Sequence, residues 1–393
     1  MVIIHAAVFL PEGELAPEHF IRVEGAEITA VGPMRDYAAR VDEQVIDAAG
    51  AAVYPGFIDA HTHLGMFEDG LGFEGDDGNE DTDPCTPHLR AIDAVNPMDR
   101  CFQEAREAGI TSVLTGPGSA NPIGGQFAAI KTFGRCIDDM VIRAPAAMKF
   151  ALGENPKSVY HDKSAAPVTR MATSALIREQ LYKAQEYFEQ KSRNAEDDQP
   201  DYDMKCESLG SLLRGEIPAQ IHAHRADDIF TAARLAEEFG LRYAVVHCTQ
   251  GYLAAQELAA KGISAMCGPL ISDRSKPELR GSTPANPGIL SRAGVKVCIV
   301  TDHPELPIQY LPLCAGIAVR EGMVRAEALR AITLYPAQIA GIDGRVGSIE
   351  VGKDADLCLF QTDPLSVEGR PEWVMINGKI VFDRGEGVPN ERN

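Results

Sequence analysis

Short apolar runs alternate with helix-patterned stretches over the central part of the chain, and no other feature constrains the fold as strongly. The stretch "ADDIFTAARLAEEFG" places Ile229, Ala233, Ala236 and Phe239 on one helical face. The runs are apolar throughout, which is typical of strands in a parallel sheet covered by helices. They include "GFIDAH", "TSVLTG", "AAMKFALG", "AQIHAH", "YAVVHC", "ISAMCGP" and "VKVCIVTD". This alternation predicts an α/β fold, a (β/α)₈ barrel. The alternative, a doubly wound sheet, lacks its usual Gly-x-Gly-x-x-Gly turn after a strand.

The two ends of the chain read as short strands separated by turns. "MVIIHAAVFL" opens the chain, and "PEWVMINGKIVFDR" near its end contains Asn377-Gly378, a strong hairpin signal. Neither end has enough apolar sequence to fold well alone, so we expect both to pair in one small β-domain. The predicted organisation is a β-domain from residues 1–54 and 343–393, with the barrel at 55–342 between them.

The charge balance limits the classes of partner. The 393 residues carry a formal net charge of -20, which argues against nucleic acid or an anionic membrane as the main partner. The nine cysteines are scattered and form no Cys-x-x-Cys, so we expect reduced thiols and a cytoplasmic protein. The first residues lack a basic start and a small-residue cleavage site, and no apolar run reaches the length of a membrane span, so we expect neither a signal peptide nor a membrane anchor.

Six of the ten histidines fall at the ends of predicted strands: His61, His63, His222, His224, His247 and His303. In a parallel barrel these ends meet at one mouth, where catalytic residues collect. Residues two apart on a strand share a face, so His61 and His63 can hold one divalent ion. Together with His222, His247 and Asp302 they predict a metal site.

A site with two metal ions would also need a bridging ligand, and "AAMKFALGENPK" offers two candidates. Glu154 is a carboxylate just past the strand. Lys149 lies within the strand, between the small residues Ala147 and Ala151, and would serve only if CO₂ carboxylated it. We favour Glu154 slightly because it needs no modification. If neither residue binds metal, we expect Lys149 to be a buried lysine paired with an acid and Glu154 to cap the helix that follows.

This pattern resembles the amidohydrolase superfamily. "PGFIDAHTH" resembles its first-strand signature, single histidines stand at the fifth and sixth strand positions, and "TD" at Asp302 matches the eighth. "GSIEVGKDADLCLF" resembles the family's returning strand, which joins the N-terminal strands in a composite β-sandwich. The likeness covers nearly the whole chain. Within the superfamily the chain is similar to the branch with imidazolonepropionase, metal-dependent Xaa-Pro dipeptidases and related cyclic-amide hydrolases.

The resemblance implies a role for each matching residue. His61 and His63 would hold the more buried metal, His222 and His247 the second, and Asp302 would contact metal and act as general base. One or two divalent ions are implied, with zinc as the default and manganese or iron accepted by similar sites. The implied activity is hydrolysis of a C–N bond, in a cyclic amide or dipeptide-like amide, by metal-activated water.

The substrate is less constrained than the chemistry, because loops rather than strand ends select it. His224 and His303 are candidates for substrate contact, and Arg274, with Lys276 and Arg280, for binding a carboxylate. The loop at residues 64–90 carries eight acidic residues and could attract a cation or simply be solvated surface. Deamination of a small nitrogen heterocycle, deacetylation of an N-acyl sugar and a catalytically silent assembly protein are the alternatives. We expect a small-molecule substrate and a homo-oligomer.

Overall fold

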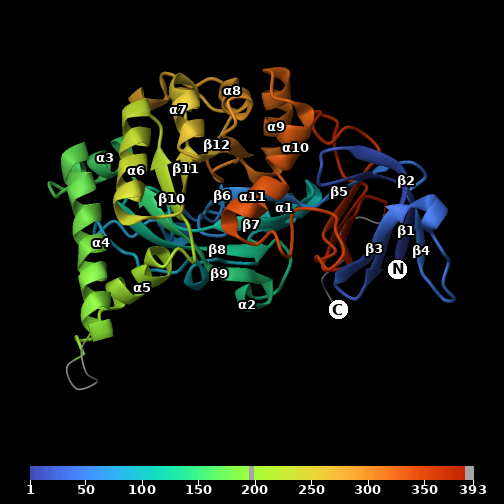
Figure 1. The fold of residues 1–393 in the computed structure, drawn as a ribbon, viewed down its shortest axis with the longest axis horizontal. Coiled ribbons are helices and arrows are strands. Elements are labelled where there is room, and N and C mark those ends of the chain that lie inside the picture. Colours follow the sequence, from blue (N-terminus) through green and yellow to red (C-terminus); the bar gives the residue numbers. More distant parts are fainter. Residues whose placement is uncertain (194–198, 386–393) are drawn as a thin grey trace.

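The computed structural model describes residues 1–193 and 199–385. It contains two eight-stranded sheets that lie beside each other along the long axis of the molecule (Figure 1). The first sheet is built from both ends of the chain, and the second from its centre. The mixed α/β class, the barrel and the β-structure shared by both termini are therefore confirmed.

The terminal sheet has the strand order β16-β15-β14-β5-β1-β2-β3, with β4 paired to β1. Antiparallel pairing of β14 with β5 joins the C-terminal strands to the N-terminal ones. Asn377 and Gly378 form the turn between β15 and β16, with φ values of 50° and 74°, as the predicted hairpin requires. The strands are β1 (Val2–Phe9), β2 (Leu15–Glu24), β3 (Glu27–Pro33), β4 (Val45–Asp47), β5 (Ala52–Pro55), β14 (Leu357–Phe360), β15 (Trp373–Ile376) and β16 (Lys379–Asp383).

The central sheet follows the chain order from β6 to β13 and curls into a nearly closed barrel. Backbone hydrogen bonds from Asp302 N to His61 O (3.2 Å) and from His63 N to His303 O (2.8 Å) link its two edges at the mouth. The strands are β6 (Phe57–Thr62), β7 (Ile110–Thr115), β8 (Ile123–Lys131), β9 (Val141–Ala151), β10 (Ala219–Ala223), β11 (Tyr243–His247), β12 (Ser264–Cys267) and β13 (Lys296–Ile299).

The barrel departs from the predicted all-parallel sheet at β8, which runs antiparallel to both β7 and β9. A parallel crossover needs a dozen or more residues, and the segment between β7 and β8 is too short to supply one. The segment between Thr115 and Ile123 is therefore the connection of a hairpin.

Eleven α-helices accompany these strands in the described part of the chain. They are α1 (Arg100–Glu107), α2 (Ile137–Met140), α3 (Glu154–Asp162), α4 (Arg170–Arg193), α5 (Met204–Leu213), α6 (Ala226–Phe239), α7 (Ala255–Ala260), α8 (Asn286–Arg292), α9 (Leu311–Arg320), α10 (Arg325–Arg330) and α11 (Leu334–Ala340). The predicted apolar face of α6 is buried at all four positions.

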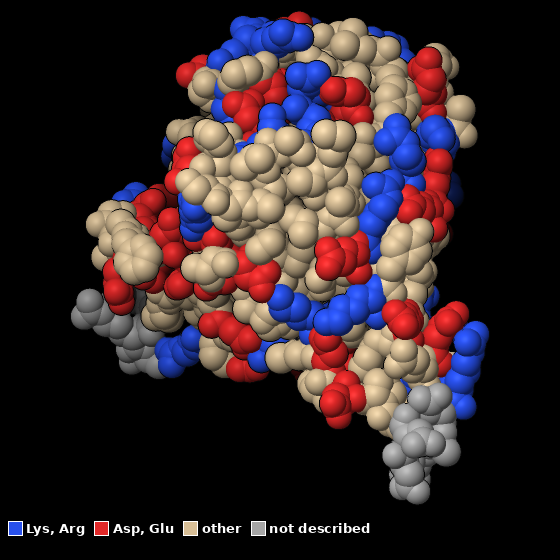
Figure 2. Space-filling model, turned by 90° about the vertical axis from the view of Figure 1, so that its left-hand side faces the viewer, with Lys and Arg blue, Asp and Glu red and all other residues tan. Residues whose placement is uncertain are grey.

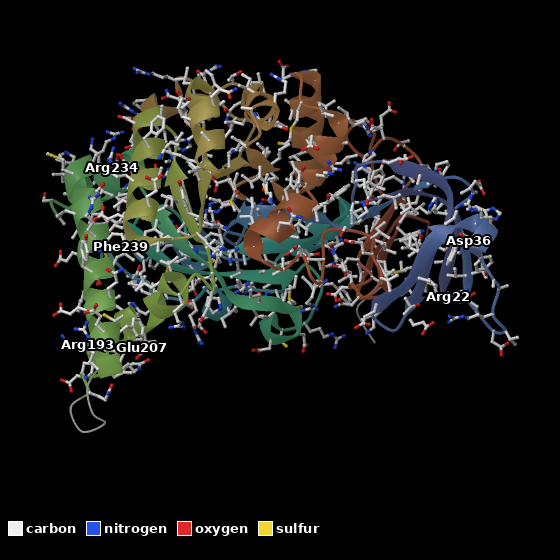
Figure 3. All side chains as sticks on the ribbon, in the orientation of Figure 1. Arg22, Asp36, Arg193, Glu207, Arg234 and Phe239 are labelled. Atoms are coloured by element: carbon white, nitrogen blue, oxygen red, sulfur yellow. The ribbon has the colours of Figure 1, made fainter. Side chains whose placement is uncertain are left out.

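Helix α4 packs along α5 and α6 at one end of the molecule. The ring of Tyr182 on α4 meets Phe239 on α6 edge-on, with centroids 4.8 Å apart, and Tyr187 donates to the Glu207 carboxylate on α5 at 2.5 Å (Figure 3). On this side of the molecule Lys and Arg side chains are interspersed with Asp and Glu around a broad uncharged area (Figure 2). That face has no continuous basic surface for a polyanion.

One apolar core connects the barrel to the terminal sheet. Phe9, Tyr54 and Phe360 from the terminal sheet and Phe57 from β6 belong to the same buried cluster. Their rings contact one another at tilted or edge-on angles, with centroids 5.7 to 6.4 Å apart. Strand β5 ends at Pro55 and α11 at Ala340, close to the proposed domain limits. Residues 386–393, which the prediction assigned to the β-domain, lie outside the described residues.

All nine cysteines are free, and Cys136 is the exposed one. No helix in residues 1–193 or 199–385 combines the length and the apolar character needed to span a membrane.

Candidate metal centre

The carboxyl ends of the barrel strands bring the predicted ligands together. His61 lies in β6 and His63 directly follows it, His222 lies in β10, His247 ends β11, and Asp302 follows β13. All five are buried, and none is more than 9% exposed. Two groups have ligand atoms within 4.8 Å of one another: His61, His247 and Asp302, and His222, His224 and His247. Because His247 belongs to both, the two groups are neighbours.

Hydrogen bonds fix which ring nitrogen carries the proton. His63 Nδ1 lies 2.6 Å from the carbonyl of Gly116, and His247 Nδ1 lies 2.7 Å from that of Gly268. A carbonyl only accepts, so both Nδ1 atoms donate. The Gln220 amide nitrogen donates to Ala60 O, which leaves Gln220 Oε1 facing His61 Nδ1 at 2.6 Å. An amide oxygen only accepts, so His61 Nδ1 donates as well. Metal-binding histidines are commonly oriented by such a bond from the other ring nitrogen.

The remaining Nε2 atoms of these three histidines face a carboxylate, and that of His61 also lies 3.0 Å from Lys149 Nζ. His61 Nε2 and His63 Nε2 lie 3.4 and 3.3 Å from Asp302 Oδ1, and His247 Nε2 lies 3.8 Å from Asp302 Oδ2. Burial, helped by nearby Lys149, lowers the pKa of His61 to about 3, so this ring is neutral at pH 7. Acceptor atoms packed against acceptor atoms call for a cation between them, and this donor set fits a divalent metal ion.

The second group contains an unpartnered atom. His222 Nε2 is buried without a hydrogen-bond partner among the described residues, while its Nδ1 lies 3.0 Å from Ser119 Oγ. His224 Nδ1 lies 2.7 Å from Thr249 Oγ1. Burial and neighbouring histidines hold the pKa of His222 well below its ordinary value, so this ring also presents a neutral nitrogen.

The backbone at the mouth adopts a conformation that only strong local contacts sustain. His247 and Asp302 have φ values of 67° and 56°, in the left-handed region that side chains other than glycine seldom occupy. Asp59 Oδ2 accepts from the N–H (2.9 Å) and hydroxyl (2.6 Å) of Thr301, and its Oδ1 accepts from the N–H of His61 (3.1 Å). Asp59 thereby ties the His61 strand to the segment that carries Asp302.

Lys149 lies inside the cluster. It is fully buried, and its Nζ lies 3.0 Å from His61 Nε2. A side chain at Gly124 would come within 3.3 Å of Lys149 Cγ, so that glycine makes room for the lysine. Within the described chain Nζ has no ion-pair partner, unlike the paired lysine considered from sequence. Burial lowers the pKa of Lys149 to about 7, which makes the uncharged amine accessible near neutral pH.

Glu154 lies at the start of α3, outside both ligand groups. Its Oε2 accepts from the N–H of Glu278 at 3.3 Å, and its own N–H donates to Glu278 Oε2 at 3.0 Å. This reciprocal pair is the helix-cap role considered for Glu154. It lines the cavity above the histidines rather than the space between them.

A cavity of about 660 Å³ opens over the two groups. Some of the predicted substrate contacts line this cavity and others do not. His224 lines it, as does Lys276, whose Nζ donates to Asn155 Oδ1 at 3.1 Å. Arg274 lies outside the lining because its guanidinium donates to the carbonyl of Ser282 at 2.9 Å. His303 is buried beneath the lining and accepts from the N–H of Ile308 at 3.3 Å.

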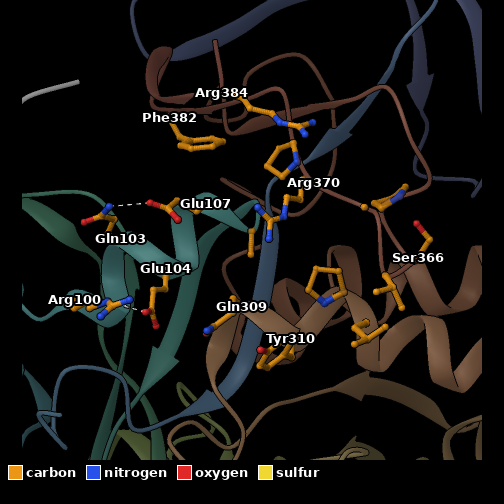
Figure 4. A pocket seen from close by; sticks show the side chains of 17 residues that line it. Arg100, Gln103, Glu104, Glu107, Gln309, Tyr310, Ser366, Arg370, Phe382 and Arg384 are labelled. Atoms are coloured by element: carbon orange, nitrogen blue, oxygen red, sulfur yellow. Dashed lines mark hydrogen bonds and ion pairs between the residues drawn. The ribbon is translucent and has the colours of Figure 1, made fainter. Parts of the chain in front are cut away.

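A second cavity, of about 410 Å³, lies between the barrel and the terminal sheet (Figure 4). Its wall contains the ion pair of Arg100 with Glu104 (2.8 Å) and a hydrogen bond from Gln103 to Glu107 (2.8 Å). None of its lining residues is a histidine, cysteine or aspartate. The mouth of the barrel is therefore the cavity with groups for metal-assisted chemistry.

Four residues of the site were not predicted from the sequence: Asp59, Gln220, Phe67 and Glu278. Asp59 and Gln220 stand two positions before His61 and His222, so strand periodicity was an available signal for both. Phe67 lines the cavity and meets the His63 ring edge-on at 5.8 Å. Glu278 lies in a loop, where no periodic pattern marks it.

Comparison with known proteins gives consistent matches. The model of the amidohydrolase family matches residues 218–381. A solved structure of an amidohydrolase from Thermotoga maritima MSB8 superposes with a TM-score of 0.93 at 38% identity, covering 98% of this chain and 100% of that one. Amidohydrolase tasK of Hapsidospora irregularis is 32% identical over 88% of this chain, which spans only 38% of that longer protein. Imidazolonepropionase of Pseudomonas fluorescens is 25% identical, covering 86% of each chain.

Proposed function

Because the chain belongs to the amidohydrolase family, we propose that it is a metal-dependent hydrolase that cleaves the C–N bond of a small cyclic amide or dipeptide-like amide. The observation that carries the metal dependence is the set of Nε2 atoms of His61, His63 and His247 that face the Asp302 carboxylate. The Lys149 amine can donate to His61 Nε2. Without a metal cation, the Nε2 atoms of His63 and His247 would still face the buried Asp302 carboxylate uncompensated.

We assign one divalent ion to His61, His63 and Asp302, and a second to His222 and His247. Lys149, carboxylated by CO₂, is the proposed bridge, in preference to Glu154. Its support is its place beside His61 Nε2 and the lack of an ion-pair partner in the described chain. The imidazole-rich donor set suits zinc best. The free thiols are consistent with a cytoplasmic location, which we also propose.

The ions, when bound, would polarise the substrate carbonyl and make a water molecule more acidic. Asp302 lines the cavity and is the proposed general base. Its carboxylate would take the proton of the attacking water and later deliver it to the leaving nitrogen. Asp59 and the bonds from the Nδ1 atoms would hold these groups in place while they act.

The charged groups of the cavity wall suggest the substrate class. Lys276 is the single lysine or arginine among its lining residues, and Glu154 and Asp273 line the same cavity. A pocket with one fixed cation and several carboxylates suits a small amide that carries a carboxylate and a basic nitrogen. Imidazolonepropionase relatives make cyclic amides of this kind the first compounds to try.

The test combines metal content with product analysis. Protein purified without chelator should hold close to two divalent ions per chain and should open cyclic amides or cleave dipeptides without releasing ammonia. His61→Ala should lose metal and turnover together. Ammonia release from a nitrogen heterocycle would instead favour a deaminase, and acetate release from an N-acyl sugar a deacetylase. Failure to bind metal, even after incubation with zinc or manganese, would reject the proposal and favour a catalytically silent assembly protein.

A further inference from the structure

Glu278 is a buried carboxylate below the wall of the active-site cavity, and the mechanism above does not use it. It lies in the short 3₁₀ helix Pro277–Leu279, which follows β12. The residue is 2% exposed, and it is not among the residues that line the cavity. Its Oε1 lies 3.8 Å from His222 Nε2 and 3.7 Å from His224 Nε2.

The surrounding chain holds this carboxylate in place. Its Oε2 accepts from the N–H of Glu154, which fixes one oxygen and turns the other toward the histidines. Gly153 lies next to the Glu278 carboxylate and has a φ of +81°. A side chain at position 153 would come within 2.9 Å of Glu278 Oε2. Both the positive φ and the close approach favour glycine at position 153. The hydrogen bond from Glu154 and the glycine at position 153 therefore define the position of the Glu278 carboxylate.

Two polar atoms in this space lack hydrogen-bond partners in the described chain: Glu278 Oε1 and His222 Nε2. A buried carboxylate oxygen without compensation is costly. A carboxylate and an unprotonated imidazole nitrogen are both acceptors, so they cannot satisfy each other. Two ligands of one ion, each about 2.1 Å from it, are at most about 4 Å apart. The separations of 3.7 and 3.8 Å allow one ion to contact Glu278 Oε1 together with either His222 Nε2 or His224 Nε2.

Other sources of positive charge fit less well. Lys276 is two residues away, but its ammonium donates to Asn155 and makes no ion pair with Glu278 among the described residues. An ammonium group of a substrate in the cavity would have to reach beneath its wall, because Glu278 does not line it. A small ion enclosed by the three side chains meets neither obstacle.

We propose that Glu278 supplies a carboxylate ligand to a divalent ion at the His222, His224 and His247 cluster. The inference rests on the proposed function, since it places a further ligand on the second ion. It makes His224 a neighbour of the metal as well as part of the cavity wall. In this assignment, the reciprocal hydrogen bonds between Glu154 and Glu278 set the position of a metal ligand.

The decisive experiment measures zinc binding by the full-length chain and its Glu278→Gln variant. The amide oxygen of glutamine can still accept from Glu154 N–H, so the fold around residue 278 should persist. After equilibration with zinc and removal of the excess, the variant should hold one equivalent less than wild type or bind its second equivalent at least about tenfold more weakly. In cobalt-loaded protein, the visible absorption of one of the two ions should change.

Glu257→Gln, an exposed residue on α7, is the matched control and should bind zinc and cobalt as wild type does. Wild-type stoichiometry, affinity and spectrum in Glu278→Gln would overturn the inference and leave the proposed function intact. No zinc in wild type would overturn both. If Glu278→Gln fails to fold, Glu278→Asp takes its place, because its shorter carboxylate should weaken the second equivalent. Unchanged zinc affinity in that variant would also overturn the inference.

Discussion

At the scale of single residues, Asp302 combines two proposed roles, metal ligand and general base. It faces the Nε2 atoms of His61 and His63 and also borders the cavity. Asp302→Asn keeps the size of the side chain and its capacity to accept at Oδ1, but it cannot take a proton from water. We expect metal to be retained and kcat to fall by about 10²- to 10⁴-fold, the usual contribution of a general base. Parallel kcat and metal-content measurements check this. Near wild-type turnover would mean that another group is the base.

A second prediction at the residue scale concerns which residue, Lys149 or Glu154, bridges the two metal ions. Lys149→Met removes the amine that CO₂ would modify, and we expect the metal content to fall by about one ion per chain or more. Glu154→Gln alters only the reciprocal pair at the start of α3, and it should keep the wild-type metal content. Elemental analysis of the two variants decides between the bridges. Loss of metal in Glu154→Gln with retention in Lys149→Met would restore the glutamate bridge.

The sequence could predict the residues at the ends of strands but not most of those on longer loops. The convergence of His61, His63, His222 and Asp302 could be predicted because strand ends of a barrel meet at one mouth. Asp59 and Gln220 were within reach of the same period-two rule. Glu278 was not, because its contacts with His222 and Glu154 depend on how loops far apart in the chain fold toward each other. The position of Arg274 was also beyond reach, since its guanidinium donates to the carbonyl of Ser282, eight residues away, and it does not line the cavity.

At the scale of elements, α5 depends on a capped N-terminus. Asp203 Oδ1 accepts from the N–H groups of Lys205 (2.9 Å) and Cys206 (3.0 Å), and Oδ2 pairs with Lys183 on α4 at 2.8 Å. These contacts lower the pKa of Asp203 from 3.8 to about 2, with the Lys183 bond as the largest cause. Asp203→Ala removes both the cap and the link between the helices. We expect it to reduce the free energy of unfolding by about 1 kcal/mol at pH 7.

The pH dependence of this loss follows from the direction of the shift. A carboxylate whose folded pKa is depressed adds stability above its unfolded pKa, and it loses that contribution as pH falls through the folded value. The difference between wild type and Asp203→Ala should therefore be constant above about pH 5 and shrink between about pH 4 and 2. Asp203→Asn keeps a capping side chain and should be milder at pH 7. Urea titrations over this range test it, and a difference that grows on acidification would contradict it.

Strand β8 shows why an element can be missed when its neighbours are found. Its sequence "IGGQFAAIK" has two glycines and a glutamine, so it lacks the continuous apolar character of the other barrel strands. Those features suit its position: Gly124 makes room for Lys149, and Gly125 approaches the backbone of Leu89. The predicted fold survives because the strand still occupies its place between β7 and β9. Its direction could have been inferred only from the short connection after β7.

For the whole molecule, the junction between barrel and terminal sheet determines whether the two parts unfold together. The aromatic series of Phe9, Tyr54, Phe57 and Phe360 crosses it inside one apolar core. Lys131 of β8 crosses it too, and its ammonium lies 2.5 Å from Asp356 and 2.9 Å from Asp354 just before β14. Lys131 is 2% exposed, so both the packing and the ion pairs there are shielded from water.

Lys131→Met tests this junction. It should remove about 3 to 5 kcal/mol of stability, because it leaves two carboxylates of a largely buried site without their cation. Trp373, the single tryptophan, lies in the terminal sheet, whereas most of the far-UV circular dichroism comes from the helices around the barrel. In urea, tryptophan fluorescence and circular dichroism should give coincident transitions in wild type, and the variant should move both to lower urea by the same amount. Lys261→Met, which breaks an exposed pair with Glu237, should move neither appreciably. If only the tryptophan transition shifts in Lys131→Met, the terminal sheet unfolds on its own, and the shared core is not what holds the two parts together.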